Sequence, residues 1–426
     1  MTAPEKAAPN TRSLILMMGP GLLLAATGVG GGDLATGSIV GGLLGTAVLW
    51  AVLVGALLKF VVTEGLARWQ LATGLTLLEG AVQRLGRVVV WLFLPYLFLW
   101  SFFVASAQMS ACGIALHAML PVFDQANDGK IAFGILSGIV GVGLVLRGGY
   151  RLFEHVMRVC IAVMFVTVVV TAGLLWPGTG EVLQGLFVPR IPDLRGEGLS
   201  WTIALIGGVG GTLTVLCYGY WLREEGLTRP EHLRACRADL GAGYLMTAAF
   251  GIAMIIVGSN VPVQGSGASL LVDLSDRLEE LLGPIGKWMF LAGTLGAVFS
   301  SLLGVWQSVP YLFADCWNLL HRDRSQGPDA AATVDTSATP YRAYLVLIAV
   351  VPMLGLFASF RDVQKFYTVT GALFFPLLAL ALLIFNGRVG WIGARFTNRP
   401  MTTAALVGVL AFFSWMAIVE FGMFQS

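Results

Sequence analysis

Two glycine-rich interruptions lie inside long apolar stretches of this chain. The first is Gly28-Val29-Gly30-Gly31, and the same four-residue pattern recurs at Gly208–Gly211. Each glycine costs a helix about 1 kcal/mol relative to alanine. Backbone that unwinds inside a bilayer needs protein or a water-filled cavity to satisfy its amide and carbonyl groups. We therefore predict two broken transmembrane helices, although close packing of helices on small residues is the alternative for either cluster alone.

The composition is that of a membrane protein. The chain is 57% hydrophobic and 12% charged, whereas about 25% of a soluble domain is charged. The five cysteines form no CxxC pair, and the four histidines show no HxxxH or HExxH spacing. Because no nucleophile–histidine–carboxylate set and no P-loop lysine is present, we expect neither an enzyme nor a bound cofactor. The expected partners are the lipid bilayer and a small solute or cation, without nucleic acid, and the expected state is a monomer.

Apolar stretches long enough to cross a bilayer predict an all-α polytopic membrane protein of eleven spans. The first and sixth of them contain the two interruptions, near 28–33 and 208–212. The predicted spans cover about 13–46, 47–67, 87–117, 131–147, 152–176, 199–222, 240–258, 285–320, 341–360, 363–386 and 401–423.

Breaks at matching places in two halves predict inverted repeats, the usual plan of a secondary transporter. Most of the 26 Lys and Arg residues fall in the segments on the N-terminal side of the predicted membrane. The positive-inside rule then predicts a cytoplasmic N-terminus and an extracytoplasmic C-terminus, in the inner membrane if the source is bacterial. The predicted segments are a cytoplasmic tail (1–12), a first repeat (13–176), an extracytoplasmic loop (177–198), a second repeat (199–386) and a segment with helix 11 (387–426). The second repeat includes a flexible cytoplasmic linker (322–340).

Short motifs spread over most of the chain carry a family resemblance. They are Gly19-Pro20-Gly21 through Leu34-Ala35-Thr36, Ala67-Arg68 with Ala72-Thr73-Gly74, Ile114-Ala115-Leu116, Phe299-Ser300-Ser301, and Pro376 with the apolar run to Phe385. In order and spacing the chain resembles the Nramp family, proton-coupled transporters of manganese and iron. The resemblance implies the LeuT-type fold, with helices 1–5 and 6–10 as inverted repeats, helix 11 added, and the substrate between broken helices 1 and 6.

The chain departs from that family where the family binds metal. Its Asp-Pro-Gly-Asn signature falls on Gly30, Gly31, Gly32 and Asp33, and its Met-Pro-His signature falls on Gly211, Thr212 and Leu213. The glutamine of its tenth helix falls on Phe374, and the acidic residues of its third helix fall on Ala105 and Gln108. The departures predict a changed metal site without sulfur, which suits hard cations such as magnesium, calcium or manganese, and a changed proton route.

Two ionisable residues inside predicted spans are the main candidates for chemistry. Asp33 could bind a cation or a proton, because a carboxylate at mid-membrane is costly and usually functional. It could also simply cap the second half of helix 1, and both roles can hold together. Lys59 could carry the coupling proton. We favour the simpler interpretation that Lys59 snorkels to the inner interface.

Residues around the two interruptions complete the expected site. Tyr220 and Trp221 could line a cavity for an organic substrate, but we favour an interfacial aromatic belt. Arg223, Glu224 and Glu225 could form an inner gate, but we favour ordinary surface charges. The predicted substrate-binding residues are Gly30, Gly31, Gly32, Asp33, Gly210, Gly211, Thr212, Thr214, Tyr218 and Gln108, with Asp33 as the single metal ligand and Asp33 and Lys59 as the coupling residues.

Two transport hypotheses follow from these residues. The first is Nramp-like secondary transport of a divalent metal cation that keeps part of its water, held by Asp33, backbone carbonyls, Thr212 and Thr214. The second is transport of a non-metal solute, organic or anionic, by the same fold, because exposed half-helix N–H groups can hold a carboxylate. A non-transporting sensor or scaffold is a third class, but it would need a larger cytoplasmic segment than the linker.

Overall fold

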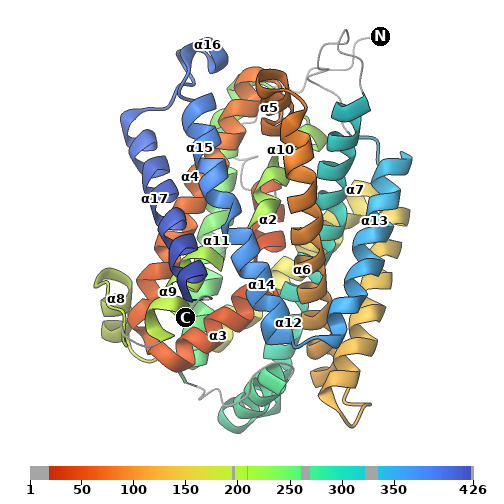
Figure 1. The fold of residues 1–426 in the computed structure, drawn as a ribbon. Helices are drawn as coiled ribbons and strands as arrows, with labels where there is room; N and C mark the ends of the chain where they lie inside the picture. Colours follow the sequence, from red (N-terminus) through yellow and green to blue (C-terminus); the bar gives the residue numbers. More distant parts are fainter. Residues whose placement is uncertain (1–18, 194–196, 209, 261–268, 322–333, 424–426) are drawn as a thin grey trace.

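The computed structural model describes residues 19–193, 197–208, 210–260, 269–321 and 334–423. Within these ranges the chain is a bundle of helices, and no strand occurs among them (Figure 1). The long helices are α4 (Leu49–Thr73), α6 (Val88–Met119), α7 (Ala126–Leu174), α11 (Leu233–Ser259), α12 (Ser269–His321) and α17 (Pro400–Met423). The shorter ones are α2 (Pro20–Gly28), α3 (Gly31–Leu44), α5 (Leu77–Leu85), α8 (Thr179–Phe187), α9 (Glu197–Gly208), α10 (Tyr218–Glu224), α13 (Thr339–Val350), α14 (Phe360–Ala372), α15 (Phe374–Phe385) and α16 (Val389–Ile392), with 3-10 turns η1 (Gly45–Val48), η2 (Leu213–Cys217), η3 (Pro230–His232) and η4 (Val351–Phe357).

The described residues contain nine helical stretches that are long and apolar enough to cross a membrane. The first of these, Asp33–Thr73, holds the end of the first predicted span and all of the second. Helix α7 holds two stretches, Ala126–Arg147 and Tyr150–Leu174, and Pro400–Met416 is a shorter apolar helix. Each of the eleven predicted spans therefore has a helical counterpart.

Both predicted helix breaks are confirmed, although the first is shorter than expected. Helix α2 ends at Gly28 and α3 begins at Gly31, so only Val29 and Gly30 lie outside helix. Gly31 and Gly32 belong to the first turn of α3, because N–H groups at a helix start need no intrahelical partner.

The second break is wider than the first. Helix α9 ends at Gly208, and a 3-10 turn, Leu213–Cys217, precedes α10. Gly210 and Gly211 have φ angles of 79° and 85°, a conformation that a residue with a Cβ rarely adopts. Glycine is therefore required at these two positions by the backbone path itself.

Three other features differ from the predicted spans. The tenth span is interrupted at Leu373, because Pro376 has no N–H to donate to the carbonyl of Ala372. Helix α12 starts before the predicted eighth span and bends at Gly283, whose φ is 74°. The predicted polar loop 177–198 contains helix α8 and the start of α9. The predicted tail 1–12 and most of the linker 322–340 lie outside the described residues.

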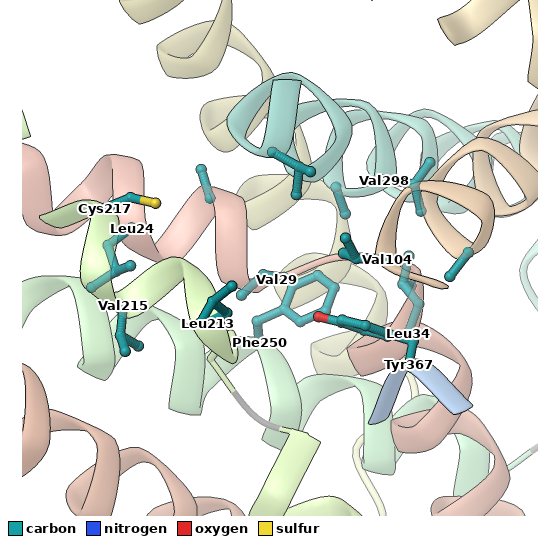
Figure 2. Packing of buried hydrophobic residues seen from close by; sticks show 14 of the residues in the cluster. Leu24, Val29, Leu34, Val104, Leu213, Val215, Cys217, Phe250, Val298 and Tyr367 are labelled. Atoms are coloured by element: carbon teal, nitrogen blue, oxygen red, sulfur yellow. The ribbon is translucent and has the colours of Figure 1, made fainter. Parts of the chain in front are cut away.

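An apolar core surrounds the two breaks. Val29 from the first break and Leu213 from the second are 1% and 0% exposed, and Phe250 of α11 packs in the same cluster (Figure 2). The short half-helix α2 packs between α11 and α12 inside the bundle, and α10 packs against α2 and α4 (Figure 1). The breaks are thus enclosed by protein, as unpaired backbone groups in a membrane require.

Candidate functional site

The two breaks touch through their backbones. A methyl group added at Gly28 would lie 2.6 Å from the carbonyl carbon of Gly210 and 2.8 Å from the amide nitrogen of Gly211. One added at Gly211 would lie 3.2 Å from Cα of Gly28. Residues from the two halves of the chain therefore meet at the centre of the bundle, at a distance that only glycine permits.

Helix α12 satisfies the last carbonyl groups of α2. Ser300 Oγ donates to the carbonyl of Ala26 at 3.2 Å, and Ser301 Oγ donates to the carbonyl of Thr27 at 2.7 Å. A methyl group at Gly30 would lie 2.5 Å from Ser301 Oγ and 2.8 Å from Nε2 of Gln108. The predicted site residues Gly30 and Gln108 are therefore neighbours, and Ser301 joins them.

Asp33 is buried in the first turn of α3, next to both breaks. Its Oδ2 accepts a hydrogen bond of 3.4 Å from the Gly30 N–H, and the Gly210 N–H is a second backbone donor. The carboxylate thus faces the positive end of α3, where a negative charge is stabilised. This arrangement matches the predicted capping role. It also places the carboxylate of Asp33 where the two halves of the described chain meet.

The prediction that Lys59 snorkels to an interface is wrong. Its side chain is completely buried, and Nζ donates to the carbonyl of Gly207 at 2.8 Å. Gly207 lies in the last turn of α9, where the orphan carbonyls attract a cation. Nζ also lies 5.2 Å from the centre of the Phe375 ring and interacts with the opposite charge of Asp33. Lys59 and Asp33 are therefore two buried groups of opposite charge at the ends of two broken helices, with no direct ion pair between them among the described residues.

Thr212 connects the second break to α6 and α14. Its hydroxyl oxygen accepts a hydrogen bond of 3.0 Å from the Trp100 indole N–H, and it also pairs with the Tyr367 hydroxyl. A methyl group at Gly371 would lie 2.5 Å from Thr212 Cγ2, so α14 approaches the break closely. Thr214 differs from Thr212, because its buried hydroxyl has no hydrogen-bond partner among the described residues. An unpaired buried hydroxyl beside the break is a candidate contact for a bound substrate.

Tyr218 lies apart from the other predicted site residues. Its hydroxyl donates to Asp239 at 3.3 Å, and Oδ2 of Asp239 accepts a bond of 2.5 Å from the Gly21 N–H. Tyr218 thus supports the start of α2 rather than the contact between the breaks.

The predictions for residues 220–225 are corrected as well. Tyr220 and Trp221 are 3% and 0% exposed, so they are interior residues and not an interfacial belt. Arg223 is 6% exposed and pairs with Glu79, so it is not a surface charge. These side chains are buried because α10 is enclosed on all sides by the bundle.

The break region offers oxygen ligands but no cluster typical of a transition-metal site. No group of three or more His, Cys, Asp or Glu side chains occurs together within the part of the chain that the structure describes. The carboxylate of Asp33 and the hydroxyl of Thr214 are hard donors. Sequence reasoning missed Ser300, Ser301, Trp100 and Tyr367 as parts of this site. The adjacent serines in an apolar helix were the available signal, because such serines commonly bond between helices.

The arrangement of the two broken helices identifies the class of protein. Two broken helices from different halves meet at a buried polar site in a bundle of membrane-length helices, which is the plan of a LeuT-type transporter. Among solved structures, a point mutant of the manganese transporter of Eremococcus coleocola superimposes with a TM-score of 0.78 at 17% identity, covering 99% of this chain and 88% of that one. MhsT in complex with L-phenylalanine superimposes with a TM-score of 0.61 at 16% identity, covering 94% and 97%. These similarities establish the LeuT-type fold.

The chain belongs to the Nramp family. The model of the natural resistance-associated macrophage protein-like family matches residues 21–421. An uncharacterised protein of Pasteurella multocida is 23% identical over 64% of this chain, and the match spans 63% of that protein. A divalent metal cation transporter MntH of Mycobacterium tuberculosis is 25% identical over 67% of each chain.

Proposed function

We propose that this protein is a secondary active transporter of the Nramp type whose substrate is a divalent metal cation. The observation that supports this proposal most strongly is the buried carboxylate of Asp33 at the contact between the two broken helices. A carboxylate inside a membrane bundle usually marks an ion pathway. The names of the relatives, which are transporters of manganese or of divalent metal cations, support the same class of substrate.

The proposed cation is a hard one that keeps part of its hydration shell. Asp33 supplies one charge, and the hydroxyl of Thr214 supplies a neutral oxygen. Such a set suits Mg²⁺ or Mn²⁺, because Mg²⁺ in particular is reluctant to lose all its water. No group of three or more His, Cys, Asp or Glu side chains occurs together among the described residues, so selectivity for softer metals is not expected.

A second candidate substrate is a small anionic or organic solute. Lys59 favours it, because the lysine already balances the charge of Asp33 and leaves the site neutral. A neutral site attracts a divalent cation less strongly than a free carboxylate would. N–H groups at the start of α3 could then hold the carboxylate of such a solute.

The proposed orientation puts the end of the bundle that carries α5 and α10 at the cytoplasm (Figure 1). The bias of Lys and Arg toward that side supports it, as does the end of α17 at the opposite side. A bacterial source would make this an inner-membrane protein, and we expect it to work as a monomer without a cofactor.

Calorimetric titration of the purified protein with MnCl₂ and with MgCl₂ tests the metal proposal. Wild type should bind at least one of the two ions, and Asp33→Asn should weaken binding about tenfold or more, because a charge-assisted contact is lost. Asparagine can still cap α3, so this variant should remain folded. Asp335→Asn, at an exposed carboxylate, should bind like wild type. Absence of heat from both ions with folded wild type would contradict the metal proposal and favour small carboxylates as the next ligands to titrate.

A further inference from the structure

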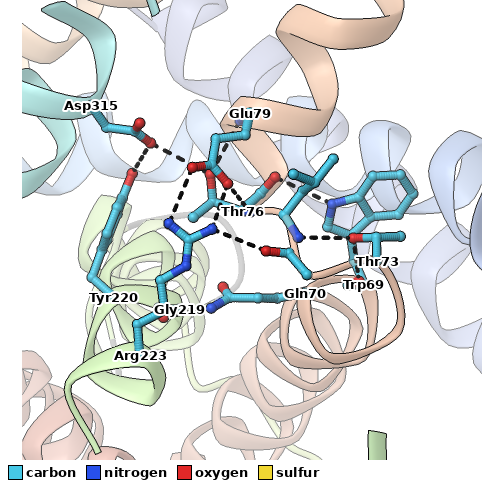
Figure 3. Close-up of polar contacts among 11 residues, drawn as sticks. Trp69, Gln70, Thr73, Thr76, Glu79, Gly219, Tyr220, Arg223 and Asp315 are labelled. Atoms are coloured by element: carbon cyan, nitrogen blue, oxygen red, sulfur yellow. Dashed lines mark hydrogen bonds and ion pairs between the residues drawn. The ribbon is translucent and has the colours of Figure 1, made fainter. Parts of the chain in front are cut away.

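A second buried polar cluster closes the α5 and α10 end of the bundle. Arg223 of α10 donates two hydrogen bonds to Glu79 of α5, at 3.1 and 2.6 Å, and a third to the carbonyl of Gly74 at 3.1 Å (Figure 3). Gln70 of α4 donates to the carbonyl of Gly219 at 2.7 Å. Side chains from α4, α5 and α10 thus fix the second half of the sixth span in place.

Asp315 of α12 is the second carboxylate of this cluster. Its Oδ2 accepts a bond of 2.5 Å from the Tyr220 hydroxyl and one of 3.4 Å from the Thr76 hydroxyl. Asp315 is 6% exposed, and the nearest arginine, Arg223, is already committed to both oxygens of Glu79. Arg223 is therefore the counter-charge of both carboxylates in this buried cluster. The cluster has a net charge of −1 when both Glu79 and Asp315 are ionised.

Among the residues that the structure describes, the other groups around Asp315 add no further positive charge. The titratable side chains that face it are Glu79 from α5, Tyr220 and Arg223 from α10, and Cys316 from its own helix. On the side of α6, Val90 packs beside Cys316 in an apolar cluster. An ionised carboxylate in such a place is costly, and a proton removes the cost.

A polar cavity lies close to this cluster. It has a volume of about 300 Å³ and is lined by Val145, Tyr150, Glu224, Gln307, Tyr311, Val334, Asp335, Thr336 and Tyr341. The Tyr311 ring stacks on the Tyr220 ring, with centroids 5.7 Å apart and planes 13° apart. Tyr311 also donates to Glu224 at 3.0 Å. One aromatic ring therefore separates a polar cavity from the tyrosine that holds Asp315.

We propose that Asp315 is a proton-binding residue of this transporter, and that its proton keeps the α5 and α10 end closed. The carboxylate takes one proton from the solution on that side and becomes a neutral acid, and it returns the proton to the same side when α10 moves away. No other bond is made or broken. With the proton bound, Glu79 and Arg223 form a neutral pair and the cluster is compatible with the closed arrangement. Without it, Asp315 and Glu79 repel each other and favour separation of α5, α10 and α12.

This inference rests on the proposed function and deepens it, because it supplies a proton-dependent closure for one end of the transporter. It depends on residues distant from Asp33 in the sequence and held by different helices. Its test can therefore be made without any knowledge of the substrate.

Infrared difference spectroscopy of the full chain in lipid vesicles, between about pH 5 and about pH 8, tests the inference. Wild type should show the C=O stretching band of a protonated carboxylic acid at the lower pH. Asp315→Asn should lose its component of that band, whereas Asp124→Asn, at an exposed carboxylate away from the cavity, should keep every component. Glu79→Gln should move the appearance of the band to lower pH, because the charge of Arg223 then stabilises only one ionised carboxylate, that of Asp315.

A band that persists unchanged in Asp315→Asn, or that does not move in Glu79→Gln, would overturn the inference. Should Asp315→Asn fail to fold, Tyr220→Phe replaces it, because loss of the hydroxyl must shift the frequency of the Asp315 band. An unshifted band in Tyr220→Phe likewise overturns the inference. Metal titration of the same samples keeps the two proposals apart, since Asp315→Asn should bind Mn²⁺ or Mg²⁺ like wild type.

Discussion

The contact between the breaks and the closed end of the bundle are both buried, but they are built differently. At the breaks, glycine backbones touch, and one carboxylate is balanced by one lysine. At the closed end, long side chains from α4, α5, α10 and α12 meet around Arg223, and the charges are not balanced. Backbone contacts at van der Waals distance fix one arrangement, whereas ion pairs can separate and form again. This difference supports our two proposals, that the substrate binds at the centre and that the α5 and α10 end opens and closes.

Replacement of Lys59 should have the largest effect on the centre. Lys59→Met removes the donor to the buried Gly207 carbonyl, which alone costs about 1–3 kcal/mol, and it also removes the positive charge that interacts with Asp33. A large fall in melting temperature of the purified protein is expected. The double variant Lys59→Met with Asp33→Asn should recover part of that loss. Equal instability of the single and double variants would show that the two charges are not coupled.

Bulk at the backbone contact should have the next largest effect. Gly28→Ala places a methyl group 2.6 Å from the Gly210 carbonyl carbon, and overpacking of this kind costs about 1–3 kcal/mol. The melting temperature and the affinity for the metal ion should both fall. Gly208→Ala is the matched control, because a methyl group there meets nothing within 4 Å. Similar behaviour of the two variants would mean that the halves do not touch as described.

Removal of the arginine should loosen the closed end without changing the centre. Arg223→Met leaves Glu79 without its partner, a loss of about 1–3 kcal/mol. Cys217, which is fully buried just before α10, should then react with a water-soluble thiol reagent about tenfold faster or more. The rate is measured with the other four cysteines replaced by alanine. An unchanged rate would argue against Arg223 as part of the closure.

The smallest effect is expected at the link between Thr212 and α6. Trp100→Phe removes one buried hydrogen bond, worth about 1 kcal/mol, and keeps most of the ring volume. A modest fall in melting temperature with nearly normal metal titration is expected. Loss of metal binding in this variant would instead make Trp100 part of the binding site.

Much of the fold was predictable from local sequence. Long apolar stretches set the spans, and the repeated Gly-Val-Gly-Gly pattern marked both breaks, because chain length and glycine content act locally. The burial of Lys59 was not predictable in this way. Its surroundings come from α9 and α15, far along the chain, and only tertiary packing brings the Gly207 carbonyl and the Phe375 ring to it.

The sequence by itself determined that this protein is a bundle of membrane helices, two of them broken at glycines, with Asp33 at the first break. Tertiary structure alone decided that the breaks touch, that Asp33 and Lys59 are buried groups of opposite charge that interact, and that Glu79, Arg223 and Asp315 share one buried cluster. The physical reason is the distance along the chain over which each effect acts. Glycine content and hydropathy act on neighbouring residues, whereas the balance of a buried charge depends on helices that meet only when the whole chain has folded.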